Sequence, residues 1–209
     1  MKILRVICSP RGTASESYRL SQSLIRHLIE HHRGSNFVIT ERGVAGLPHV
    51  DGEYAAAMSK RRDPASEPAP GGSLTLAEQL VREVEGADCL VIATPMHNLS
   101  VPSALKAWLD HVIQSDRTFR ITAAGKIGLL RDRPVFIAIA SGGVFSNDNP
   151  QQPDFLTPYL RAALATIGLH NLTFFSVEGT GQPSTLPATR DAAELALKVH
   201  FSKPLAVAV

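Results

Sequence analysis

Four hydroxyl side chains stand close together near the start of the chain, at Ser9, Thr13, Ser15 and Ser17. They follow a short apolar run, residues 3–8, and lead into a segment with helical periodicity. A loop between a strand and a helix presents the free N–H groups and the positive dipole end of that helix, and hydroxyls add further donors. This pattern predicts an anion site, and the natural occupant is a phosphate.

Other features of this loop bear on that prediction. Ser15 is also a good helix N-cap, a role that needs no ligand. Glu16 places a negative charge beside the proposed anion, so its side chain is expected to point away from it. The loop has neither the lysine of a P-loop nor a GxGxxG pattern. A phosphate would therefore rest on backbone N–H groups, serine hydroxyls and the helix dipole.

A second polar loop follows the most hydrophobic run of the chain, and it contains Pro95, Met96, His97, Asn98 and Leu99. Its backbone groups and the Asn98 amide are suited to the polar edge of a planar ring, with Met96 and Leu99 on the apolar surface of that ring. The alternative is that Met96 fills the core and His97 is an exposed turn residue.

A third loop, Ser141, Gly142 and Gly143, follows another apolar run. Paired glycines permit close backbone approach to a ligand, although they also occur in plain turns. Parallel strands present their carboxyl ends to the same edge of a sheet, where ligands of open α/β folds bind. One ligand could therefore touch all three loops.

The elements that must position these loops can be read from periodicity. Five short apolar runs alternate with amphipathic helical patterns, which predicts a flavodoxin-like, doubly wound α/β fold. We expect one domain over residues 1–209, with a five-stranded parallel sheet of order 2-1-3-4-5 and helices on both faces. The predicted strands are residues 3–8, 37–40, 89–93, 134–140 and 172–177, and the predicted helices are residues 15–34, 75–85, 102–112, 155–167 and 187–201.

Two stretches have no strong pattern. Residues 44–74 are broken repeatedly by proline and glycine and hold one possible helical piece, residues 54–60. A segment of this length is either functional, for example as an oligomer contact, or a surface excursion. Residues 118–130 read as a loop.

Composition excludes several classes of protein. The 209 residues carry a formal net charge of +2 with dispersed basic residues, so no nucleic-acid partner is expected. The only local basic clusters, Arg131 with Arg133 and residues 60–62, read as solvated loops. No stretch approaches the roughly 20 apolar residues of a membrane span, and no signal peptide is apparent. Cys8 and Cys89 lie in apolar runs and are expected to be buried free thiols of a cytoplasmic protein.

A rival phosphate chemistry uses the same topology. Low-molecular-weight tyrosine phosphatases and arsenate reductases place a thiolate after the first strand and an arginine six residues later to clamp the phosphate. Here Cys8 is followed at that distance by Ala14. GxSxG, HExxH and paired CxxC motifs are absent from the sequence, and no metal site is expected. Phosphatase chemistry is therefore excluded.

With these loops the sequence resembles the FMN-dependent NADH:azoreductases, a flavodoxin-like family that also includes quinone reductases. The resemblance covers nearly the whole chain. It is carried by SxxxxxSxS at Ser9, Ser15 and Ser17, PMxN at residues 95–98, TFR at residues 118–120, SGG at residues 141–143 and TPYL at residues 157–160.

The resemblance implies FMN as cofactor and residue roles at its site. The phosphate would be held by Ser9, Ser15, Glu16 and Ser17, the isoalloxazine by residues 95–99, and its far edge by residues 141–143. The family works as a homodimer with both active sites at the interface. Phe119 and Ile121 would then belong to the substrate wall. This sequence departs from frequent family residues at Glu16, His97 and Leu99, which bears on acceptor preference.

The predicted activity is the transfer of two electrons from NADH or NADPH to a quinone or an azo compound by a ping-pong route. Because FMN carries the reaction, no catalytic side chain is expected. The alternative is a flavodoxin-type electron carrier without nicotinamide chemistry. The segment 44–74 and the near-neutral charge disfavour it, since carriers that dock on redox partners usually use a strongly acidic face.

Overall fold

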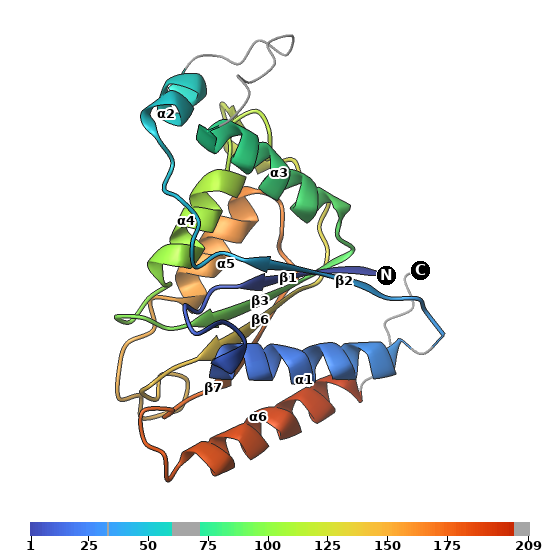
Figure 1. The fold of residues 1–209 in the computed structure, drawn as a ribbon, viewed down its shortest axis with the longest axis vertical. Coiled ribbons are helices and arrows are strands. Elements are labelled where there is room, and N and C mark those ends of the chain that lie inside the picture. The colour runs from blue at the N-terminus through green and yellow to red at the C-terminus, as the bar shows by residue number, and fades with distance from the viewer. Residues whose placement is uncertain (33, 60–71, 203–209) are drawn as a thin grey trace.

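The centre of the computed structural model, which describes residues 1–32, 34–59 and 72–202, is a parallel five-stranded sheet (Figure 1). Its strands lie in the order β2-β1-β3-β6-β7. Counted within this sheet alone, the order is 2-1-3-4-5, which confirms the predicted topology. The strands are β1 (Lys2–Ile7), β2 (Val38–Gly43), β3 (Cys89–Pro95), β6 (Val135–Ala140) and β7 (Leu172–Val177).

Helices cover both faces of the sheet (Figure 1). One face carries α1 (Glu16–His31) and α6 (Leu186–Phe201), and the other carries α3 (Gly72–Gly86), α4 (Ser103–Val112) and α5 (Thr157–Thr166). In β1 the side chains alternate between the two layers: Leu4 packs with the second group of helices and Ile3 with the first. Central strands covered on both sides have to be apolar throughout, which explains the continuous hydrophobic runs.

The first helix shows why these residues form an amphipathic element. Leu20, Leu24 and Leu28 recur at four-residue spacing and are at most 5% exposed. Such spacing places them on one face of a helix, and burying each contributes about 1.5–3 kcal/mol. The helix begins at Glu16 and ends at His31, slightly before the predicted end near Gly34.

The segment between β2 and α3 is structured where it is described. The predicted helical piece is present as α2 (Gly52–Ser59), and the basic residues 60–62 lie outside the described residues. The Tyr54 hydroxyl donates to the Asp110 carbonyl of α4 at 2.9 Å. The Asp51 carboxylate accepts from Tyr54 N at 2.8 Å and from Ser73 Oγ at 2.7 Å. These bonds tie the start of α2 to α3 and α4.

The expectation of a loop at residues 118–130 was wrong. The segment forms a two-stranded antiparallel hairpin, β4 (Phe119–Thr122) and β5 (Gly125–Gly128). Its base packs backbone to backbone, because a Cβ added at Gly128 would lie 2.1 Å from Gly168 N. Glycines that read as loop residues in the sequence therefore permit the close approach that seats the hairpin beside the end of α5.

Candidate functional site

The three polar loops lie at the carboxyl edge of neighbouring strands. β1, β3 and β6 are adjacent in the sheet, and their pairing continues to the points where the loops leave it. Cys8 N donates to Ala93 O at 2.9 Å, and Met96 N donates to Ala140 O at 2.8 Å. A ligand at this edge would face the start of α1 and both other loops at once.

The first loop and the start of α1 hold three buried hydroxyls. Ser15 is the N-cap of α1: its Oγ accepts from Tyr18 N at 3.2 Å and donates to Gly12 O at 2.8 Å. Ser17 Oγ lies 3.3 Å from Ser15 Oγ, and Ser9, Ser15 and Ser17 are each at most 6% exposed.

This donor set fits a phosphate. The first-turn N–H groups of α1 have no acceptor within the helix, and the helix dipole adds positive potential there. The Ser15 hydroxyl would have to rotate from Gly12 O to donate to an anion. Ser15 therefore caps the helix, and this role does not prevent it from binding a phosphate.

The Glu16 carboxylate at the start of α1 is paired with arginine. Arg190 of α6 donates to both of its oxygens, from Nε at 2.9 Å and from Nη2 at 2.6 Å. Arg19 Nε lies 3.7 Å from the same carboxylate. The hydrogen bond from Arg190 is the largest influence on the pKa of Glu16 and, with the nearby arginine charges, lowers it against the opposing effect of burial. Glu16 is therefore held as a carboxylate that faces α6.

The second loop is a tight turn with two residues in a left-handed conformation. His97 and Ser100 exchange backbone hydrogen bonds of 3.0 Å, and the residues between them, Asn98 and Leu99, have φ angles of 47° and 71°. Positive φ at both central positions is the type I′ geometry, which favours asparagine or glycine. A leucine there is strained by about 1–2 kcal/mol, and such strain clusters at functional sites.

A glutamine that the sequence analysis missed joins the second and third loops. Gln152 Nε2 donates to Ser141 Oγ at 2.8 Å and lies 3.0 Å from Met96 Sδ. Met96 is 8% exposed and belongs to the main core, so core filling is part of its role. His97 is exposed, as expected of a turn residue. The Cα of Gly142 has open space beside it, since a Cβ there would meet nothing within 4 Å.

The third loop is held by Glu178, a buried carboxylate directly after β7. It accepts from Phe145 N at 2.7 Å and Ser146 N at 3.2 Å, and from the hydroxyls of Ser146 and Ser176. Thr180 N and Oγ1 both donate to the Ser141 carbonyl at 3.0 Å. The loop after β7 thus clamps residues 141–146. An acidic residue just past a strand was the only sequence signal for this role.

Phe119 and Ile121 are not at this edge of the same chain. Phe155 N donates to Leu99 O at the start of α5, whereas the hairpin base contacts Gly168, past its end. A ten-residue helix such as α5 spans about 15 Å, so the base of the hairpin lies roughly that far from the turn that contains Leu99. Phe119 is 7% exposed and Ile121 is 66% exposed.

The two thiols are buried and free, as predicted. Burial raises the pKa of the Cys89 thiol to about 12 and raises the pKa of Cys8 well above its usual range. Neither is a ready nucleophile. Within the described residues, no group of three or more His, Cys, Asp or Glu side chains could hold a metal ion. None of the helices described is both long and apolar enough to cross a membrane.

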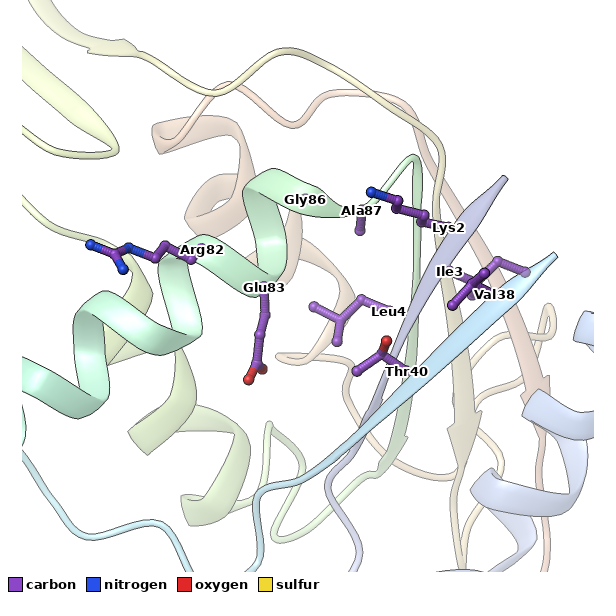
Figure 2. Close-up of a pocket in the computed structure, with 9 residues that line it drawn as sticks. All are labelled: Lys2, Ile3, Leu4, Val38, Thr40, Arg82, Glu83, Gly86 and Ala87. Carbon is purple, nitrogen blue, oxygen red and sulfur yellow. The ribbon is translucent and has the colours of Figure 1, made fainter. Parts of the chain in front are cut away.

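A groove at the opposite, amino edge of the sheet contrasts with the candidate site (Figure 2). It runs between α3 and the first residues of β1 and β2, with Leu4, Val38 and Thr40 along the strands. Its acidic residue, Glu83, is already paired with Arg42. The carboxylate of this groove is therefore already neutralised by a partner.

Comparison with known proteins shows the family to which the chain belongs. A family model described as a flavodoxin-like fold matches residues 1–201. An FMN-dependent NADH:quinone oxidoreductase 5 from Burkholderia lata is 43% identical over 177 residues, 85% of this chain and 84% of the relative. The chain belongs to this flavodoxin-like family. Another member, FMN-dependent NADH:quinone oxidoreductase 4 from Pseudomonas fluorescens, is 39% identical over 199 residues, 95% of this chain and 94% of that one.

Solved structures of the flavodoxin-like fold superpose on nearly the whole chain. The azoreductase AzrA has a TM-score of 0.81 at 21% identity and covers 97% of this chain and 99% of its own. An FMN-dependent NADH-azoreductase from Bacillus anthracis, solved in complex with FMN, has a TM-score of 0.77 at 24% identity, with 95% and 98% covered. At these identities the likeness establishes the fold.

Proposed function

We propose that this protein binds FMN and transfers two electrons from NADH to a quinone, with azo compounds as further acceptors. The observation that carries the proposal is the meeting of three polar loops at one sheet edge, in a chain 43% identical to a protein named as an FMN-dependent NADH:quinone oxidoreductase. The buried hydroxyl cluster at the start of α1 supports a phosphate there.

The residues of this chain have distinct tasks in the proposed site. Ser9, Ser15 and Ser17, with the first-turn N–H groups of α1, hold the phosphate. Residues 95–99 and 141–143 line the isoalloxazine from two loops. FMN, when bound, supplies the hydride chemistry. The paired backbone hydrogen bonds between His97 and Ser100 and the clamp by Glu178 keep both loops in place, so little reorganisation accompanies binding.

The ping-pong order is part of the proposal. Donor and acceptor would use the same open face in turn, so the chain needs one binding face. Acceptor-dependent NADH oxidation tests the activity: the FMN-loaded protein should oxidise NADH through many turnovers only when a quinone is present. A yellow, FMN-loaded protein with no such turnover would leave the electron-carrier alternative in its place.

We also propose a homodimer with both sites at the interface. The base of the hairpin that carries Phe119 and Ile121 lies roughly one helix length, about 15 Å, from the loops of its own chain, so in this proposal the two residues form a substrate wall for a second copy. The exposed apolar side chains on and beside the hairpin support such a contact: Ile121 is 66%, Ile127 52% and Leu129 42% exposed. Sedimentation as a monomer at micromolar concentration would contradict the dimer.

A cytoplasmic location is also part of the proposal, because two buried free thiols are in keeping with a reducing compartment.

A further inference from the structure

The carboxylate at the start of α1 is a problem for an anion site. Glu16 stands between Ser15 and Ser17, at the first position of the helix. A carboxylate and a phosphate compete for the same positive end of the helix dipole. Because a phosphate carries about −1.5 to −2 charge at pH 7, an unpaired Glu16 would repel it.

The structure holds the counter-charge on a different helix. α1 and α6 run side by side on one face of the sheet (Figure 1), and Arg190 of α6 reaches back to the start of α1. Its two hydrogen bonds, of 2.9 and 2.6 Å, engage both oxygens of Glu16. Paired contacts of this kind fix the direction of the carboxylate as well as its charge.

Other cations near Glu16 do not replace Arg190. Arg19 lies at 3.7 Å, and its side chain is 63% exposed. Arg11 is exposed on the loop itself. The Glu16 side chain is only 17% exposed, so its charge is screened less than that of a surface carboxylate.

We propose that Arg190 is a positioning residue for FMN, which neutralises Glu16 and holds its carboxylate against α6 so that the neighbouring loop accepts a phosphate. This inference rests on the proposed function. In this proposal Arg190 affects the affinity for the phosphate of FMN, through Glu16, and does not affect the affinity for the ring.

The test is a set of titrations of apo-protein with FMN and with riboflavin, which lacks the phosphate, followed by flavin fluorescence. Arg190→Ala should raise the Kd for FMN about tenfold. It should leave the Kd for riboflavin within about twofold of wild type. Adding Glu16→Gln to Arg190→Ala should return the FMN Kd to within about threefold of the single Glu16→Gln variant.

Two further variants separate this effect from loss of folding or helix packing. Arg190→Lys keeps the charge and should raise the FMN Kd by less than about threefold. Arg26→Ala removes another pair between the same helices, Arg26 with Glu194 at 3.1 Å, and should leave FMN affinity unchanged.

The inference is overturned if the double variant binds FMN as weakly as Arg190→Ala, or if riboflavin binding weakens to the same degree. A wild-type protein that binds no FMN would contradict the proposed function as well, and the wild-type titration alone reveals that case.

Discussion

Replacing Ser15 and Ser17 together with alanine is expected to weaken FMN binding about a hundredfold. Each hydroxyl can donate to the phosphate, and hydrogen bonds to charged groups contribute about 1.5–3 kcal/mol each. The loss should be smaller for riboflavin, which has no phosphate. FMN occupancy after dialysis, together with titration of the apo-protein, measures the effect.

A matched control lies one turn further along the same helix. Ser21 is fully buried, and its hydroxyl donates to the Tyr18 carbonyl at 2.7 Å. Ser21→Ala should leave FMN binding unchanged. The Ser15 replacement also removes an N-cap, which costs about 1 kcal/mol of stability, so thermal unfolding is recorded for each variant. Unchanged FMN occupancy in the double variant would remove this loop from the site.

The second large effect is expected at Glu178. Glu178→Ala should lower the free energy of unfolding by about 3 kcal/mol, because buried donors that it now satisfies would lose their acceptor. For a chain of this size that corresponds to a fall in Tm of about 6–12 °C. Phe145 N is the donor most affected, since Phe145 is 8% exposed. FMN binding should weaken as well, because the loop with residues 141–143 loses its clamp.

Glu178→Gln provides the comparison for this prediction. Glutamine keeps the size of the side chain and one acceptor oxygen, so it should retain the bond from Phe145 N and lose about 1 kcal/mol. Thermal unfolding followed by circular dichroism compares the three proteins. Equal Tm values for Glu178→Ala and wild type would show that the carboxylate does not hold the loop.

Periodicity predicted the sheet well because each central strand is buried on both faces and each helix on one. Residues 89–93, for example, have no alternation, and the structure covers them on both sides. The strand order then places residues 9–17, 95–99 and 141–143 at one edge without any knowledge of side-chain contacts.

The hairpin escaped prediction for a physical reason. Gly128 has the pattern of a loop residue, and its structural role is its close contact with Gly168, forty residues later in the chain. The roles of Arg190 and Gln152 could not be predicted for the same reason: their partners lie far away in the sequence. Arg190 meets Glu16 across 174 positions of sequence, and Gln152 meets Met96 across 56. Pairs of this kind depend on how helices and loops pack, which local pattern does not encode.

A pair of anaerobic rapid-mixing experiments on the FMN-loaded protein tests the proposed electron transfer. Mixing with NADH alone, without acceptor, should bleach the visible flavin absorbance, and a later addition of quinone should restore it completely. Both steps should be at least as fast as steady-state turnover. A visible absorbance that NADH leaves unchanged, in a protein that holds FMN, would contradict the proposed function.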